Sequence, residues 1–469
     1  MKLSRSTYKL LYFSIIIFTI VAILSGQVRI NSELTVIASF LVNMVIFVIY
    51  LLKSINVHSF SFDMMFWLFN LIFFGVAPLL QYVTDIYAWG LDPTKSEILK
   101  NNLLILVWSV CYIAGMHWAR RAKTTKKKEK VVKKSPVQIG YRVRHVDFLA
   151  ICVAISAMIV LYRVYTTGFY QMMFRDTNSL SVDNQTFRLL LNHGFNNFIL
   201  FTAVFCIIDA KNRKKIGAKM VIAVLCLIIG CFPTGLDRNM MASFYGGLVI
   251  ILFDKSRKGR WYALAVYAGL ILIFPAINVF RRVANAEGDI WNVMVESFGS
   301  SYLDGHYDAH QMIISVQRYV AEYGLCFGRQ ILGAFLFFVP RALWPAKPIG
   351  TGATVIHALD QFSFSNVSAP LVAESYIALG IVGVMVGAIL LARFVYRLDK
   401  AYWQSEERTS FIRIIYPFAM FMFFFILRGD LLSGWSFTFA QLFVGSCFGG
   451  FFLKKYKKKS VLVSKNEET

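Results

Sequence analysis

Long apolar runs alternate with short polar segments along nearly the whole chain. An apolar run of about 20 residues can cross the hydrocarbon core of a bilayer as one α-helix. Twelve runs qualify, the seventh and eighth being the shortest: 8–26, 34–52, 62–82, 99–118, 147–165, 189–209, 216–233, 240–254, 261–280, 371–393, 411–427 and 436–453. The pattern predicts an all-α, polytopic transmembrane helix bundle with about twelve spans.

The spacing of these runs divides the chain into four segments. Residues 1–280 hold the first nine predicted spans and a basic loop at 119–146. Residues 281–370 are predicted to form a long periplasmic or extracellular loop with short helices, which would hold the active site. Residues 371–453 hold the last three spans, and residues 454–469 form a basic cytoplasmic tail. An even number of spans predicts that both termini lie on the same side of the membrane.

Composition agrees with a membrane protein, since 57% of the residues are hydrophobic and 16% are aromatic. The net charge of +23 is distributed unevenly. If both termini are cytoplasmic, 35 of the 49 lysines and arginines lie on the inner side, as the positive-inside rule requires. The basic run 120–134 lacks interleaved aromatic residues, so we predict a solvated cytoplasmic loop and no nucleic-acid partner.

Arginine dominates the positive charge on the predicted outer side. Eleven arginines and three lysines fall there. The arginines are Arg29, Arg163, Arg175, Arg188, Arg238, Arg281, Arg282, Arg318, Arg329, Arg341 and Arg428. Arginine is preferred where a planar fork must bind phosphate or carboxylate, which indicates an anionic ligand; the alternative is that many of them snorkel at helix ends.

The loop 281–370 concentrates groups capable of chemistry. Asp304, His306 and His310 open a helical pattern that continues to about Tyr323. His306 and His310 are four residues apart and would share a helix face. No glutamate follows His306 and no third ligand has a familiar spacing, so we predict no metal site and interpret one of these groups as an acid–base or hydrogen-bonding residue.

Several other charged residues lie where a helical membrane protein rarely places them. Arg238 follows Asp237 in a tight turn between two short runs, and we expect it either to pair with a carboxylate or to contact a ligand. Glu374 lies one turn into an apolar run, which predicts an arginine partner: Arg238, Arg282 or Arg428.

The apolar stretch 331–339 is too short to span and ends before Pro340. This pattern predicts a re-entrant or interfacial helix. Such a helix would place Arg341 and Trp344 at the level of the lipid headgroups.

Four sequence blocks resemble the bacterial oligosaccharide repeat-unit polymerases, the Wzy-type O-antigen or capsular polysaccharide polymerases. The blocks are the turn 235–238, Pro340-Arg341 with Trp344-Pro345 and Lys347-Pro348, the stretch from Asn366 through Glu374 and Tyr376 to Gly383, and Arg428-Gly429-Asp430. The resemblance covers roughly residues 225–440 together with the layout of the spans.

The resemblance implies a metal-independent integral membrane glycosyltransferase of the bacterial cytoplasmic (inner) membrane. Such an enzyme passes a growing glycan from undecaprenyl pyrophosphate to a new lipid-linked repeat unit, which builds a surface polysaccharide. The implied partners are the lipid-linked oligosaccharide, the bilayer and a chain-length regulator, and no cofactor is implied. The alternatives are an O-antigen ligase and a polysaccharide flippase or other transporter.

The resemblance also implies roles for individual residues. The general base would be His306 or His310, followed by Glu374 and Asp304. The residues expected to bind the substrate or its pyrophosphate are Arg238, Arg281, Arg282, Arg341, Lys347, Tyr376 and Arg428. Structural support would come from Asp237, Trp344, Asn366 and Asp430.

Overall fold

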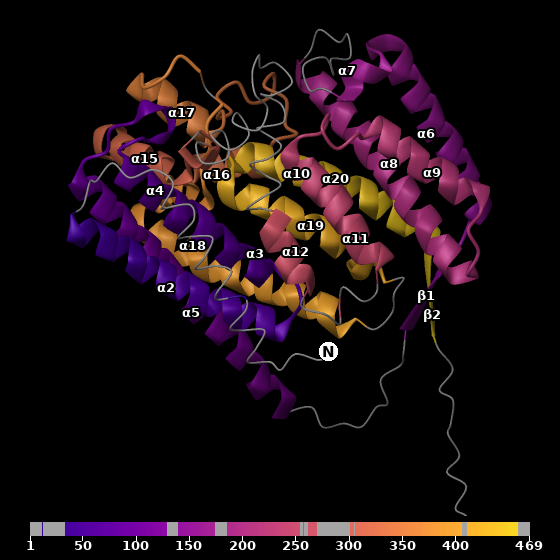
Figure 1. Cartoon of the computed structure of the whole chain (residues 1–469), viewed down its shortest axis with the longest axis horizontal. Coiled ribbons are helices and arrows are strands. Elements are labelled where there is room, and N and C mark those ends of the chain that lie inside the picture. Colours follow the sequence, from indigo (N-terminus) through magenta and orange to yellow (C-terminus); the bar gives the residue numbers. More distant parts are fainter. Residues whose placement is uncertain are drawn as a thin grey trace, which may run out of the picture. The chain divides into compact units, whose positions relative to one another are not determined.

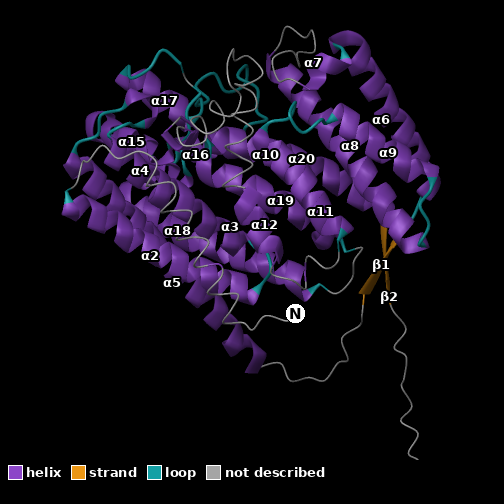
Figure 2. Cartoon of the chain, in the orientation of Figure 1, coloured by secondary structure: helices purple, strands orange, loops and turns teal. Residues whose placement is uncertain are grey.

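The computed structural model is almost entirely helical, with a single short pair of strands among the residues it describes (Figure 2). The described residues are 12, 33–128, 139–173, 185–253, 257, 261–269, 301–303, 305–364, 366–405 and 410–457.

Eight helices in the described part of the chain are long and apolar enough to cross a membrane. They are Leu34–Val57, Phe62–Thr84, Lys95–Arg121, Val146–Thr167, Asn192–Arg213, Leu371–Gln404, Phe411–Arg428 and Leu431–Phe452. Each coincides with a predicted span. The chain is therefore an all-α membrane protein by length and composition of its helices.

The other four predicted spans have different outcomes. The seventh and eighth correspond to the shorter apolar helices Ala218–Gly230 and Arg238–Leu252. The ninth begins as a helix at Trp261–Ala268, beyond which the run lies outside the described residues. The first lies outside them except for residue 12. Twelve spans stay a prediction.

The chain divides into two compact units. Unit 1 comprises residues 1–120, 253–399 and 420–438, and unit 2 comprises residues 121–252, 400–419 and 439–469. Helices α5, α18, α19 and α20 contribute to both.

The elements of unit 1 follow in chain order, and the α-helices among them are labelled in Figure 1. They are α2 (Leu34–Val57), α3 (Phe62–Phe69), the π-helix η1 (Asn70–Val76), α4 (Ala77–Thr84), the 3-10 turn η2 (Ala88–Gly90), α5 (Lys95–Lys128), α12 (Trp261–Ala268), the 3-10 turns η7 (Ser301–Leu303) and η8 (Gly305–Tyr307), α15 (Ala309–Tyr323), α16 (Arg329–Phe335), α17 (Thr351–Leu359), α18 (Leu371–Gln404), part of α19 (Phe411–Arg428) and the start of α20 (Leu431–Phe452). Helices α15, α16 and α17 are the short helices predicted between residues 281 and 370.

A continuous helix formed by α3, η1 and α4 lies at the centre of unit 1, with 94% of its apolar window buried. Its start is fixed by two caps. The Ser61 hydroxyl accepts a hydrogen bond from the Met64 amide at 2.9 Å, as a helix N-cap does. The Asp399 carboxylate accepts bonds from the Phe62 and Asp63 amides at 2.9 and 3.2 Å.

Helix α18 contains a sharp break near its start. Leu379 and Gly380 leave the helical region, and Gly380 has φ +62° and ψ −144°, a conformation open essentially to glycine alone. The segment before the break packs against the helix after it. The backbone carbonyl of Ser375 lies so close to Gly383 that a Cβ there would overlap it. The break frees the Ile377 carbonyl, which accepts a hydrogen bond from the Cys326 amide at 2.9 Å.

Unit 2 is built around three helices that lie side by side in Figure 1. They are α6 (Val146–Thr167), α8 (Gln185–Arg213) and α9 (Ala218–Gly230), with the shorter elements α7 (Phe169–Met173), α10 (Arg238–Met241), the π-helix η4 (Ala242–Gly246) and α11 (Gly247–Leu252). Their apolar faces form one core with the unit 2 parts of α19 and α20. Gly230 permits close approach, since a Cβ there would press on Val160 of α6.

Two short strands join distant parts of unit 2. Strand β1 (Ile139–Val143) pairs antiparallel with β2 (Leu453–Lys457), and Val143 lies opposite Leu453. Arg144 extends the pairing by donating through Nε to the Phe451 carbonyl at 2.8 Å and through Nη2 to the Gly450 carbonyl at 2.9 Å. The sequence predicted a solvated loop at 120–134 and a basic tail, and it gave no sign of this pairing.

Candidate functional site

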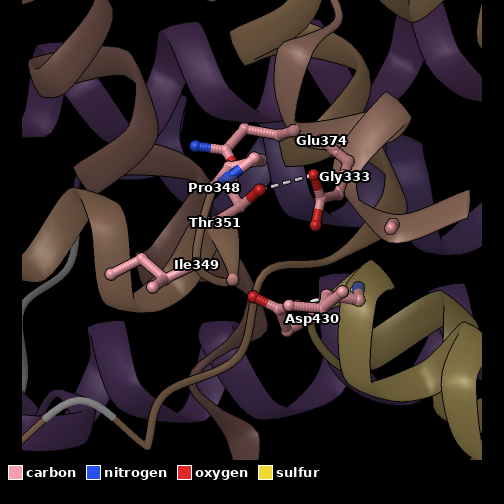
Figure 3. Close-up of a pocket in the computed structure, with 10 residues that line it drawn as sticks. Gly333, Pro348, Ile349, Thr351, Glu374 and Asp430 are labelled. Atoms are coloured by element: carbon pink, nitrogen blue, oxygen red, sulfur yellow. Dashed lines mark hydrogen bonds between the residues drawn. The ribbon is translucent and has the colours of Figure 1, made fainter. Parts of the chain in front are cut away.

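One polar pocket in unit 1 is lined by four helices and the loop before α17 (Figure 3). Its lining residues are Gln330, Gly333, Ala334, Pro348, Ile349, Gly350, Thr351, Glu374, Asp430 and Leu432. We call it the carboxylate pocket, after Glu374 and Asp430. The space between these residues is too narrow to hold a water molecule.

Three helices begin at this pocket: α17 at Thr351, α18 at Leu371 and α20 at Leu431. The first N–H groups of a helix have no partner within it and carry partial positive charge. Negatively charged groups are therefore favoured here. Glu374 lies in the first turn of α18, and Asp430 directly precedes α20.

The Glu374 carboxylate joins the starts of two other helices. Its Oε2 accepts a hydrogen bond from the Thr351 hydroxyl at 2.6 Å, drawn as the dashed line in Figure 3. Its Oε1 accepts one from the Leu431 amide at 3.0 Å. Only 1% of Glu374 is exposed. Among the described residues Glu374 has no ion-pair partner, and its carboxylate is stabilised by hydrogen bonds and helix dipoles.

Asp430 links the same two helix starts from the other side. Its Oδ1 accepts from the Leu432 amide at 2.9 Å, and its Oδ2 accepts from the Gly352 amide at 3.3 Å. Burial raises the pKa of Asp430, although these amide N–H groups act to lower it. Gly350 must be a glycine for this arrangement, because a Cβ would overlap the Asp430 carboxylate.

The prediction that Arg428 is a candidate partner of Glu374 is wrong. Arg428 donates through Nη2 to Asp308 Oδ1 and to the Gly305 carbonyl, both at 3.3 Å. Its guanidinium also lies 6.0 Å from the centre of the Phe73 ring. The reason is that the Leu431 amide and the Thr351 hydroxyl already donate to the two oxygens of Glu374, whereas Arg428 pairs with the buried Asp308 carboxylate.

Asp308 organises a second cluster in unit 1 and was not assigned a role by the sequence. It is fully buried, and its Oδ2 accepts from Trp89 Nε1 at 3.0 Å and from the Ser368 amide at 3.1 Å. These bonds connect Arg428 to segments more than 200 residues apart in sequence. The available signal was its position directly before a helical pattern, where an aspartate is common.

The two histidines do not share a helix face, so that prediction is wrong. His306 lies half-buried in η8, and His310 lies buried in the first turn of α15, which begins only at Ala309. The Nε2 of His310 lies 3.0 Å from Asn102 Oδ1, so a neutral ring donates its proton there. Its ring centre is 5.4 Å from that of Phe40. The structure brings neither histidine to the carboxylate pocket.

Acid should destabilise the protein through His310. Burial lowers the pKa of His310 to about 3 from its usual 6.5. Below pH 6.5 the imidazole binds a proton in the unfolded chain, whereas in the folded chain it binds one only near pH 3. The free energy of unfolding therefore decreases as the pH falls through this window. Between about pH 6.5 and pH 5 the loss is roughly 2 kcal/mol. Thermal unfolding in detergent at about pH 7.5 and about pH 5 measures it. His310→Gln should lose less stability across that interval, and an equal loss in both proteins would contradict the assignment.

The remaining predicted residues of unit 1 do not line the pocket. Arg341 is exposed, and its Nη1 donates to the Lys347 carbonyl at 2.8 Å. Lys347 Nζ donates to the carbonyls of Phe337 and Val339, and the latter distance is 3.0 Å. Trp344 and Tyr376 are half-buried, and Asn366 is exposed. The predicted interfacial helix is α16, which ends at Phe335, well before Pro340.

Five predicted residues are not assigned to the pocket. Arg238 and Asp237 belong to unit 2, at the start of α10. Their turn is held against α7, because the Thr234 hydroxyl donates to the Met173 carbonyl at 2.6 Å. Arg281, Arg282 and Asp304 lie outside the described residues.

Within the part of the chain that the structure describes, no three His, Cys, Asp or Glu side chains cluster as metal ligands would. No protein-family model, curated protein or solved structure matches this chain.

Proposed function

We propose that the protein is an integral membrane glycosyltransferase that polymerises undecaprenyl-pyrophosphate-linked oligosaccharide repeat units into a surface polysaccharide. The observation that carries the proposal is the convergence of three separate sequence blocks on the carboxylate pocket. Pro348, Glu374 and Asp430 belong to three of the four blocks that resemble the Wzy-type polymerases, and all three line the pocket.

The surface beside the pocket suits a lipid-linked substrate. Helix α16 turns Gly333 and Ala334 toward the pocket, whereas its opposite side exposes 52% of Leu332 and 49% of Phe335. Phe338 and Leu343 in the following loop are exposed by 63% and 79%. A prenyl chain bound along this apolar surface would hold its sugar near Glu374.

In the proposed reaction Glu374 is the general base. The acceptor hydroxyl attacks the anomeric carbon of the donor sugar, and its proton passes to the Glu374 carboxylate. The new C–O bond forms as the bond from the anomeric carbon to the pyrophosphate oxygen breaks, and undecaprenyl pyrophosphate leaves with that electron pair. Since the pocket is closed to water, α16 and the loop after it must move to admit the hydroxyl.

Arg341 is assigned to the departing pyrophosphate. Its guanidinium is exposed and donates one hydrogen bond to the Lys347 carbonyl, so most of its five N–H donors are directed elsewhere. Preorganised donors of this kind stabilise the negative charge that develops on the leaving group.

The proposal is tested with purified protein in proteoliposomes supplied with lipid-linked repeat units. We expect a ladder of polymer lengths and release of undecaprenyl pyrophosphate, with both persisting in excess EDTA. A ladder that disappears in EDTA and returns with Mg²⁺ would contradict the metal-independent chemistry.

Two outcomes would favour the alternatives instead. Transfer of the glycan to a lipid A core acceptor, without polymer, would indicate a ligase. Movement of the intact lipid-linked unit across the bilayer, without any new glycosidic bond, would indicate a transporter.

A further inference from the structure

Unit 2 contains a cavity of about 330 Å³ where α8 ends and α9 begins. Its floor is apolar and comes from Leu149, Cys206, Ala210 and Met220. Its charged residues are Asp209, Arg213, Lys215 and Lys219. None of the residues discussed for glycosyl transfer lines it.

The charges at this cavity favour an anion. Arg213 Nε donates to Asp209 Oδ1 at 3.0 Å, so one cation is neutralised. Lys219 Nζ lies 3.5 Å from the Val146 carbonyl, an uncharged acceptor that does not neutralise the lysine. The Lys215 side chain makes no hydrogen bond or ion pair with any residue that the structure describes. Among the described residues, the positive charges of Lys215 and Lys219 therefore form no ion pair with a carboxylate.

The backbone adds donors to the same wall. Helix α9 starts after Gly217, which has no side chain to cap it. The amides of Met220 and Val221 bond to the Gly217 carbonyl, and the Ala218 and Lys219 amides have no acceptor among the described residues. A 13-residue helix directs partial positive charge toward this end.

The apolar surroundings identify a lipid as the source of the anion. Helix α9 exposes Ile216 just before it and Val221, Ile222, Leu225 and Ile228 along it, with exposed fractions between 42% and 72%. An acyl chain lying on this face would leave its phosphate at the level of Lys215 and Lys219. Basic pockets at the ends of spanning helices bind phospholipid headgroups in this way.

We propose that this cavity binds the phosphate of an anionic phospholipid, with its acyl chain along α9. The proposal is independent of the glycosyltransferase function. It assigns phosphate recognition to Lys215, Lys219 and the first amides of α9. A soluble phosphate compound has the same headgroup chemistry, so the test must distinguish the two.

The test measures binding of a short-chain phosphatidylglycerol to the full chain in neutral detergent. The pocket variant is Lys215→Gln/Lys219→Gln. Its matched control is Lys214→Gln/Lys454→Gln, which removes the same charge from exposed lysines that do not line the cavity. At about 1 kcal/mol per lysine, the pocket variant should bind roughly thirtyfold more weakly, and the control should bind like the wild type.

Inorganic phosphate and glycerophosphate serve as competitors without acyl chains. If neither displaces the lipid at concentrations where phosphatidylglycerol saturates, the site is a lipid site, as proposed. If inorganic phosphate binds alone with the same sensitivity to the pocket variant, the phosphate site stands and its ligand is soluble. Equal binding by pocket and control variants would overturn the proposal, since binding would then follow surface charge alone.

Discussion

Replacing Glu374 by glutamine should abolish most polymerisation while leaving the protein folded. The amide keeps both contacts, because its oxygen can accept from the Leu431 amide and its NH2 group can donate to the Thr351 hydroxyl. It cannot take a proton from the acceptor hydroxyl. Loss of general base catalysis costs about 100- to 10,000-fold in rate, which polymer length and initial rate on a gel would reveal.

The matched control is Glu322→Gln, the same change at an exposed carboxylate at the end of α15. It should polymerise like the wild type. Protein amount in the membrane and thermal unfolding must accompany both assays. Glu374→Gln protein that unfolds normally and still polymerises at the wild-type rate would make Glu374 a helix cap and nothing more.

Gly383→Ala should destabilise the protein strongly. The added Cβ meets the backbone carbonyl of Ser375, and no rotamer change can move a backbone atom away. Overpacking of this kind costs about 1–3 kcal/mol, and a backbone obstacle places the effect at the upper end. We expect a clear fall in thermal unfolding temperature in detergent and a low yield from membranes.

Gly194→Ala provides the comparison, because a Cβ at Gly194 in α8 meets nothing within 4 Å. Alanine is the better helix former by about 1 kcal/mol, so this variant should be as stable as the wild type or more so. Equal unfolding temperatures for Gly383→Ala and the wild type would show that the part of α18 before the break does not pack against Gly383.

The spans could be predicted because their signal is local. An apolar run such as 371–393 requires a helix whatever its neighbours are, and eight predicted runs have one. The break at Leu379 and Gly380 could not be predicted, since Leu-Gly within an apolar run also fits an unbroken helix. What decides it is the packing of Ser375 against Gly383, which depends on the folded chain.

The candidate site was predicted only in part, for a similar reason. The sequence indicated that Glu374 needs a partner, because a buried charge must be compensated. It could not indicate that the partners are the Leu431 amide, 57 positions away, and the Thr351 hydroxyl. Every residue except proline has a backbone N–H group, so these donors leave little trace in the side-chain sequence. An arginine was the visible candidate, and Arg428 bonds to Asp308 instead.

The pairing of β1 with β2 imposes a parity rule on the membrane crossings. Strands that share hydrogen bonds lie on one side of the bilayer, so an even number of crossings separates Val143 from Leu453. Five of the long candidate spans lie between them, an odd number. An odd number of further crossings must therefore come from residues 214–370, which include the shorter helices Ala218–Gly230 and Arg238–Leu252 and the run that starts at Trp261. The rule is satisfied if all three cross, and violated if only two of them do.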